Sequence, residues 1–183
     1  AGTPFKTIGT ALDNAEPGAT IHVAAGTYDT ANGDSFPLRF TTEAVRLIGA
    51  DPDTTIVDAD AQDRVMVVRG VGQLALVANL TLTDGRGENI DGGGVSLQLA
   101  SATVSNCIVR NNVKSNQGER GGGIHVLGGL PTFIGCTIKD NSMPSNYSAG
   151  GALGTLRTRL TLESCILSGN SARNVGGPYL EGY

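Results

Sequence analysis

Three cysteines and three asparagines recur in this sequence at a fixed step of 29 residues. A metal site needs several such ligands converging at short spacing, and one cysteine per repeat does not supply them. In the segment LTLTDG, Leu80 stands in the slot of the cysteine, which favours a small buried side chain at that position. We therefore expect structural ladders of stacked thiols and amides, with no metal and no cofactor. The ladder residues are Cys107, Cys136, Cys165, Asn112, Asn141 and Asn170.

Glycine clusters keep the same step. GGGV begins at Gly92, GGGI at Gly121 and GGAL at Gly150, and GGPY follows at 176–179. A period between 20 and 50 residues indicates a solenoid or a propeller, but a propeller blade of four antiparallel strands needs roughly 40 residues or more. Three short strands per repeat fit a parallel solenoid, in which the glycines would stand at corners where successive backbones approach closely.

The rest of the chain fits one all-β solenoid. Ile8, Ala11 and Leu12 recur at helical spacing until Pro17 and Gly18 end the pattern, which predicts a helix around residues 7–15. After it come only short strands separated by Gly, Asn, Asp and Ser turns. We expect a parallel β-helix of about six coils with a short N-terminal capping α-helix. The single domain would comprise an N-terminal segment and capping helix at 1–19, irregular coils at 20–91, and regular coils at 92–183 that are open at the C-terminal end.

The charge of the chain restricts its partners. The net charge is −4 and the isoelectric point is near 5.1, which argues against nucleic acid or an anionic membrane as the main partner. No apolar run approaches the roughly 18 residues of a membrane helix, so we expect no membrane insertion.

Two parts of the sequence resemble known β-helices. TIGTALDNAEPGATIHVAAGTY resembles the opening coil of bacterial secreted proteins in the pectate-lyase-like right-handed parallel β-helix superfamily, especially its unknown-function class, whose N-terminal helix caps the solenoid. GGGI…CTIKDN and GGAL…CILSGN resemble the GGAI/FxxN repeats of polymorphic outer-membrane proteins. The resemblance covers nearly the whole chain. It implies a right-handed β-helix of the pectin lyase fold, secreted or displayed at a bacterial cell surface.

Many relatives in that superfamily cleave or modify acidic polysaccharides, and this chemistry needs carboxylates on adjacent coils. The equivalent strand positions here hold no carboxylate pair, and the NTD, GHG and RIK motifs are absent. We therefore expect no catalytic residues. The alternative is a polysaccharide lyase or hydrolase, or a polysaccharide-binding module, whose acidic residues converge from loops. The equivalent strand positions of adjacent coils, at which catalytic carboxylates would be expected, hold Ile108, Thr137, Ile166, Arg110, Lys139 and Ser168.

The acidic stretch at 50–63 and the two histidines offer little chemistry. Asp58 begins a calcium-loop pattern, but Asp63 stands where the loop needs glycine and Arg69 where it needs glutamate. Turn aspartates are the simpler interpretation, and calcium the alternative. His22 and His125 alternate with apolar neighbours on predicted strands, so we expect each of them to face the surface or the cap.

The variable part of each repeat follows the asparagine, in GRGENID, VKSNQGER, SMPSNYSA and SARNV. Such segments emerge on one side of a solenoid and often form its binding face. The candidate binding residues on this loop face are Arg86, Lys114, Arg120, Tyr147 and Arg173.

These patterns favour a secreted or surface-displayed, non-enzymatic structural solenoid that acts in adhesion or extracellular assembly. A parallel β-helix exposes unpaired backbone at each end. Head-to-tail contact between copies would therefore propagate into filaments, which makes other copies of the chain, or an extracellular polysaccharide, the expected partners. The candidate self-assembly residues are Pro4, Phe5, Tyr179, Leu180 and Tyr183.

Overall fold

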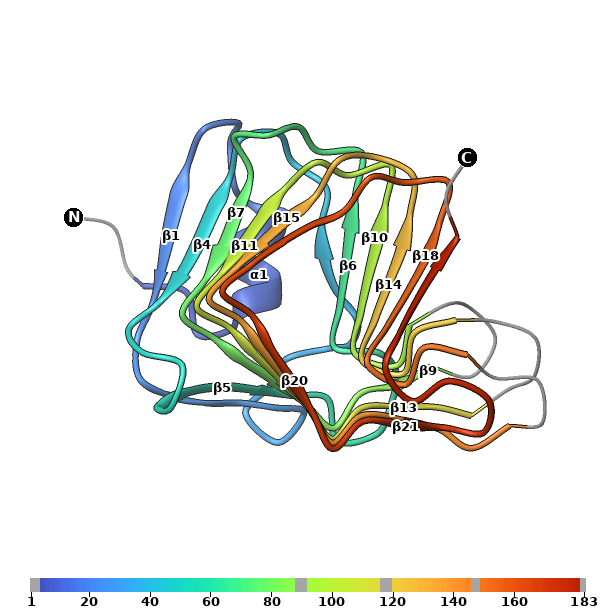
Figure 1. The fold of residues 1–183 in the computed structure, drawn as a ribbon. Helices are drawn as coiled ribbons and strands as arrows, with labels where there is room; N and C mark the ends of the chain where they lie inside the picture. The colour runs from blue at the N-terminus through green and yellow to red at the C-terminus, as the bar shows by residue number, and fades with distance from the viewer. Residues whose placement is uncertain (1–3, 88–91, 116–119, 146–148, 182–183) are drawn as a thin grey trace.

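The computed structural model describes residues 4–87, 92–115, 120–145 and 149–181. The chain coils about one axis for about five turns, and all its strands pair in parallel (Figure 1). In that view it runs anticlockwise while advancing toward the viewer, from the blue N-terminal coil to the red C-terminal coil, so the β-helix is right-handed. Within the described residues, no helix has both the length and the apolar composition needed to cross a membrane.

Four parallel sheets run along the solenoid. Sheet A contains β1 (Thr20–Val23), β4 (Arg46–Gly49), β7 (Leu76–Ala78), β11 (Thr103–Ser105), β15 (Thr132–Ile134) and β19 (Thr161–Glu163). Sheet B contains β2 (Gly26–Tyr28), β5 (Thr55–Asp58), β8 (Thr81–Thr83), β12 (Ile108–Arg110), β16 (Thr137–Lys139) and β20 (Ile166–Ser168). Sheet C contains β3 (Leu38–Phe40), β6 (Met66–Arg69), β10 (Val95–Gln98), β14 (Ile124–Leu127), β18 (Leu153–Leu156) and β22 (Pro178–Glu181). Sheet D contains β9 (Arg86–Gly87), β13 (Val113–Lys114), β17 (Ser142–Met143) and β21 (Ser171–Ala172).

Sheet D was not expected from the sequence, which predicts three strands per coil. Its strands have two residues each and lie in segments that sequence reasoning assigned to loops. Two residues are too few to show an alternating pattern, so the signal for a strand is absent from the sequence. The strands form because the preceding asparagine ladder aligns successive coils, as when Val113 pairs with Ser142.

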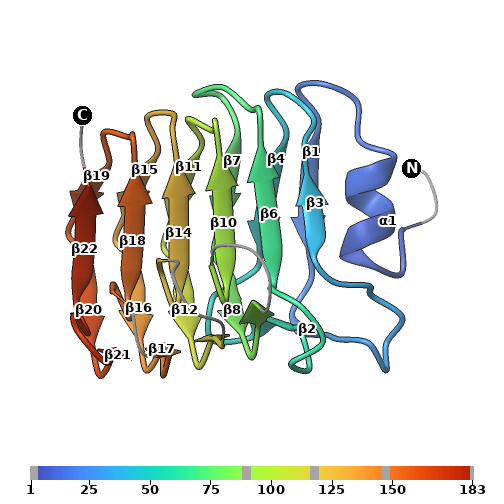
Figure 2. The ribbon, with the colours of Figure 1, turned by 90° about the vertical axis from the view of Figure 1, so that its right-hand side faces the viewer.

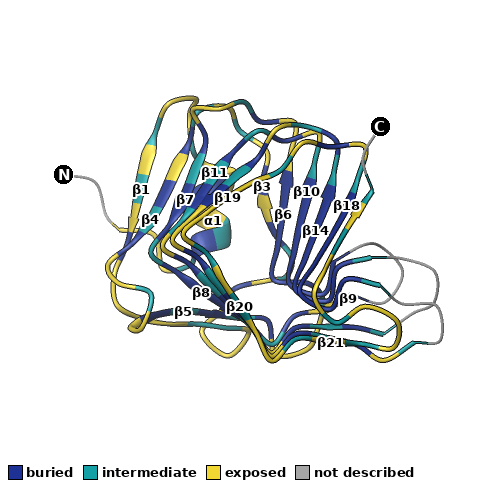
Figure 3. Cartoon of the chain, viewed as in Figure 1, coloured by how far each residue is buried: buried dark blue, intermediate teal, exposed yellow. Residues whose placement is uncertain are grey.

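The core fills the inside of the coil. On sheet A, Leu47, Val77, Val104 and Phe133 point inward, and each is almost completely buried. Their outward neighbours alternate with them, as the pleat of a strand requires. Burial decreases in the last coil, where β19, β20 and β21 are largely exposed because no further described coil covers them (Figure 3).

The asparagines form a buried ladder at the corner between sheets B and D. Asn112 donates its side-chain amide to Asn141 Oδ1 at 2.9 Å, and Asn141 donates to Asn170 Oδ1 at 2.9 Å. The glycine corner lies alongside. A Cβ on Gly93 would be 2.3 Å from the carbonyl oxygen of Gly122, so only glycine fits between the stacked coils there.

A short helix closes the N-terminal end. The helix α1 spans Ile8–Asp13, within the range expected from the sequence, and lies beside β3 at the end of the solenoid (Figure 2). The Thr7 side chain caps it by accepting from the Thr10 amide at 3.2 Å. Buried Asp34 also accepts from the amides of Ile8, at 3.3 Å, and Gly9, at 2.8 Å, which anchors the helix to the first coil.

Candidate ligand-binding groove

A groove of about 260 Å³ lies on the outer face of sheet C, where β3, β6 and β10 are neighbours. We call it the arginine groove. Three of its lining residues are arginines, and the others used below are an acid, an amide and a valine. These lining residues are Arg39, Asp63, Arg64, Val67, Arg69 and Gln98.

Strand alternation points two of the arginines outward. Arg39 stands between Leu38 and Phe40, whose side chains are buried in the core. Arg69 follows buried Val68 on the next strand. Both arginines are exposed, and no ion pair joins either of them to a carboxylate among the described residues. Each guanidinium is therefore available for a planar anion, which it can bind with two parallel hydrogen bonds.

The base of the groove holds an internal ion pair. Arg64 is 5% exposed, and its Nε lies 3.4 Å from Asp63 Oδ1. The same oxygen accepts from the Arg64 backbone amide at 2.7 Å. Asp63 is thus paired with its neighbour, and among the described residues no ion pair joins it to Arg39 or Arg69.

Beyond the groove, part of the outer face of sheet C is covered. Ser96 and His125 are register partners on β10 and β14, and both are buried. A Cβ on Gly92 would lie 3.2 Å from the Cβ of His125, which shows that the glycine corner folds over this part of the sheet. Of the two positions expected for His125, the surface is wrong, because strand alternation gives the outward direction but not what covers it. His22, on β1, is exposed.

Four of the five candidates for the loop face lie in the described residues, and their surroundings differ. Arg86 and Lys114 lie in β9 and β13 rather than in loops, and the Lys114 side chain is completely buried. Arg120 contacts its own chain, because it forms an ion pair with Glu181 and stacks on a tyrosine ring. Arg173 is exposed after β21, and Tyr147 lies outside the described residues.

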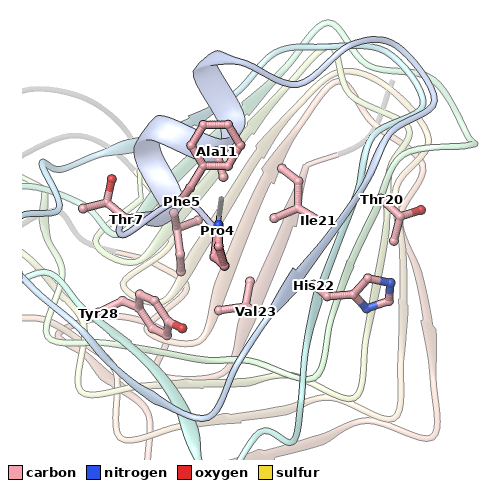
Figure 4. Close-up of a pocket in the computed structure, with 10 residues that line it drawn as sticks. Pro4, Phe5, Thr7, Ala11, Thr20, Ile21, His22, Val23 and Tyr28 are labelled. Carbon is pink, nitrogen blue, oxygen red and sulfur yellow. The ribbon is translucent and has the colours of Figure 1, made fainter. Parts of the chain in front are cut away.

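The candidate self-assembly residues lie at opposite ends. Pro4 and Phe5 line a cavity of about 250 Å³ between α1 and β1 (Figure 4). Tyr179 lies under the Arg120 guanidinium, 5.1 Å from ring centre to Cζ, whereas Leu180 is 64% exposed. Tyr183 is outside the described residues.

The acidic stretch forms turns. Asp51 Oδ1 accepts from the Asp53 amide at 2.9 Å, and Asp58 Oδ1 accepts from the Asp60 amide at the same distance. Burial raises the pKa of Asp58, and the nearby charge of Asp84 raises it further. Within the part of the chain that the structure describes, no three His, Cys, Asp or Glu side chains gather in a way that could hold a metal ion.

The cysteines differ in their access to solvent. Cys107 and Cys136 are each 1% exposed, whereas Cys165 in the last coil is half-buried. Cys107 donates to the carbonyl oxygen of Ser105 at 3.3 Å. Burial raises the pKa of Cys107 to about 12 and that of Cys136 to about 11, from an ordinary value of 9.0.

These shifts predict both reactivity and pH dependence. In the folded protein near neutral pH, a thiol reagent should label Cys165 and spare Cys107 and Cys136, because the thiolate is the reactive form. Both folded pKa values exceed 9.0, so the unfolded thiols ionise at a lower pH than the folded ones. The free energy of unfolding should therefore keep its full value below about pH 9 and decrease as the pH rises toward 11. Mass spectrometry after labelling, with denaturant titrations at about pH 8 and pH 10.5, measures both effects. Labelling of Cys107 as fast as Cys165 would contradict them.

Comparison with protein-family models matches residues 1–175 to the family described as "protein of unknown function (DUF1565)". The chain belongs to the DUF1565 family. No curated protein and no solved structure matches it. The DUF1565 match and the parallel solenoid agree with a β-helix class, while the relationship to the pectate-lyase-like superfamily and to GGxI repeat proteins remains a prediction from the sequence.

The arginines of the groove were missed because they lie in the irregular coils of this DUF1565 chain. Arg39, Arg64 and Arg69 share no repeat position, so counting along the sequence does not bring them together. The available signal was alternation, since each outer arginine follows or separates apolar residues in PLRF and VMVVR. That signal gives the direction of each side chain but not the neighbour on the next strand.

Proposed function

We propose that this DUF1565 chain is a non-enzymatic extracellular β-solenoid that binds acidic polysaccharide in the arginine groove. The observation that carries the proposal is the pair Arg39 and Arg69, exposed on adjacent strands and joined to no described carboxylate. Arg39 pairs with Val67, and Arg69 lies two residues further along β6 on the same outer face, so the two guanidinium groups can contact one stretch of a bound chain. Carboxylates of a uronic acid polymer match both their charge and their planar geometry.

Other residues of the groove suit a sugar ligand. Val67 lies between the two arginines on the outer face of β6 and provides an apolar floor for the face of a sugar ring. Gln98 donates to Ser96 at 3.3 Å, which leaves its carbonyl oxygen to accept from a hydroxyl group. Apolar contact with a few placed polar groups is the usual composition of a ligand site.

The number of carboxyl groups in the groove favours binding of a polysaccharide over its cleavage. Glycoside hydrolysis uses two carboxyl groups that flank the bond, about 5 to 10 Å apart. Asp63 is the one carboxylate among the described residues that line the groove, and it is paired with Arg64. The groove therefore supports retention of a polysaccharide, in keeping with an adhesive role at a bacterial surface or in a secreted assembly.

End-to-end packing of copies is a second candidate. It is favoured by the exposed apolar side chains of the last coil, Leu162, Ile166 and Leu180. Against it, α1 occupies the N-terminal side of β3, so a second copy could pair only with the free edges of β1 and β2. Polysaccharide binding is the better supported function because its groove needs no rearrangement.

The test is binding to polygalacturonate and to neutral dextran, measured by calorimetry. We expect salt-sensitive binding to polygalacturonate only, and a loss of about tenfold in affinity for the double variant Arg39→Gln/Arg69→Gln, because hydrogen bonds to charged groups are the strong ones. Arg46→Gln is the matched control, since Arg46 is an exposed strand arginine on the outer face of sheet A.

Three results would contradict the proposal. The parent chain could fail to bind any acidic polysaccharide, or the double variant could bind as well as the parent. Release of reducing or unsaturated ends above a blank would instead show that the chain cleaves its ligand.

A further inference from the structure

The turns that connect sheet C to sheet A form a second hollow, of about 290 Å³, which shares no lining residue with the arginine groove. We call it the turn hollow. Two glycines, two leucines and two arginines are among the residues that line it. These residues are Leu99, Gly128, Gly129, Leu130, Arg157 and Arg159.

We propose that the turn hollow binds an amphipathic carboxylate. The aliphatic body packs against Leu99 and Leu130, which both line the hollow. The anionic head contacts Arg157 and Arg159. This site is independent of the proposed polysaccharide binding, because none of its residues lines the arginine groove.

Hydrogen bonds between neighbouring turns fix the backbone that lines the hollow. The carbonyl oxygen of Gly129 accepts from the Thr158 hydroxyl at 2.8 Å, and the Leu130 amide donates to Ser101 Oγ at 3.1 Å. A Cβ on Gly129 would lie 2.2 Å from the carbonyl oxygen of Ala100, so the turn packs closely on the backbone of its neighbour at this point. A rigid site loses little conformational entropy when a ligand binds.

Two leucines that line the hollow expose much of their apolar surface to solvent. Leu99 is 69% exposed and Leu130 is 51% exposed. Leu99 also has a φ of +49°, a conformation that favours glycine. The backbone amides of Gly70, Leu99 and Gly128 each donate to the last residue of a sheet C strand in the next coil, so the three residues occupy equivalent positions. The two coils next to that of Leu99 therefore have glycine at this position. A leucine here exposes an aliphatic surface where glycine would serve the turn.

The two arginines that line the hollow favour an anionic ligand. Arg157 and Arg159 are exposed, and no ion pair joins them to a carboxylate in the described residues. Their side chains lie two positions apart on the same turn and both border the hollow. A single carboxylate head therefore has two donors, while the leucines receive its chain.

The size of the hollow limits the ligand. Because a water molecule occupies about 30 Å³, the hollow holds roughly ten non-hydrogen atoms, the size of octanoate. Octanoate is therefore the probe, with octylammonium and octyl glucoside as probes of opposite and zero charge. Chemical-shift changes of the labelled protein, followed by NMR during titration, locate the site as well as the affinity.

We expect octanoate to shift the amide signals of residues 128–130 with a dissociation constant in the millimolar range, and the other two probes to bind at least about fivefold more weakly. Arg157→Gln and Arg159→Gln should each weaken octanoate about threefold or more. Leu99→Gly should weaken it similarly without lowering the unfolding midpoint, because glycine suits the φ of this position.

Leu74→Gln is the matched control, since Leu74 is 77% exposed on a neighbouring turn and does not line the hollow. It should bind octanoate like the parent chain. The proposal is overturned if octylammonium binds as tightly as octanoate, if Leu99→Gly leaves the affinity unchanged, or if the shifts map elsewhere. Binding to anionic lipid vesicles without binding to free octanoate would also overturn it, since that identifies a membrane surface.

Discussion

Replacing Asn141 by alanine should lower the free energy of unfolding by about 4 kcal/mol, the largest effect we expect from any single side chain. Asn141 is completely buried in the middle of the amide ladder. Its Oδ1 accepts from the Asn112 amide at 3.0 Å and from the Asn112 side chain at 2.9 Å. Its Nδ2 donates to the Val109 carbonyl at 3.0 Å and to Asn170 Oδ1 at 2.9 Å. Alanine leaves these buried partners unsatisfied, and this penalty exceeds the value of the bonds themselves.

Two asparagines serve as controls for this prediction. Asn170→Ala should cost about half as much, because Asn170 stands at the half-buried end of the ladder. Asn174→Ala, at an exposed position, should change stability by less than about 0.5 kcal/mol. Urea titrations followed by circular dichroism measure all three. Equal losses for Asn141→Ala and Asn174→Ala would show that the ladder contributes nothing to stability.

Gly122→Ala should cost about 3 kcal/mol or more, because the added methyl group has no space between coils. A Cβ on Gly122 would be 2.5 Å from the carbonyl oxygen of Gly151 and 2.8 Å from that of Ser142. Both contacts are backbone atoms of neighbouring coils. They cannot rotate away as a side chain could, so the ladder itself has to open. The expected result is a lower unfolding midpoint and reduced hydrogen-exchange protection of β14 and β18.

Gly177→Ala is the matched control within the last glycine corner. No atom lies within 4 Å of a Cβ at Gly177, and its φ is not in the left-handed region. Alanine there should be neutral or should stabilise the chain by a few tenths of a kcal/mol, because it restricts the unfolded state. If Gly122→Ala were as mild as this control, the corner would not require glycine.

A repeat of 29 residues is enough to predict which positions stack. In the regular coils, Thr103 pairs with Thr132 and Thr132 with Thr161, so the register equals the period. Parallel strands at one spacing place equivalent residues above one another, and for this reason the amide ladder and the glycine corners could be read from the sequence. The capping helix could also be predicted, since it has helical spacing and a Pro-Gly end.

The irregular coils could not be aligned in this way. Along sheet A their register partners, Thr20 with Arg46, Arg46 with Leu76 and Leu76 with Thr103, are separated by unequal numbers of residues. Without a constant step, counting does not reveal that Arg39 and Arg69 share the outer face of sheet C. Strand pairing decides it, because Arg39 lies opposite Val67 on the neighbouring strand.

The sequence by itself determined the solenoid, the side chains that point into the core, and the columns of cysteine, asparagine and glycine. Each of these depends on a pattern that can be counted along the chain, either the 29-residue repeat or the alternation within a strand. Only the tertiary structure decided what covers the outer faces. Lys114 and His125 are polar residues of ordinary surface type, yet both are buried where a corner or strand of sheet D returns against its neighbours. The burial of an outward side chain depends on segments that are distant in the chain. The local sequence around the residue does not predict which of these segments will cover it.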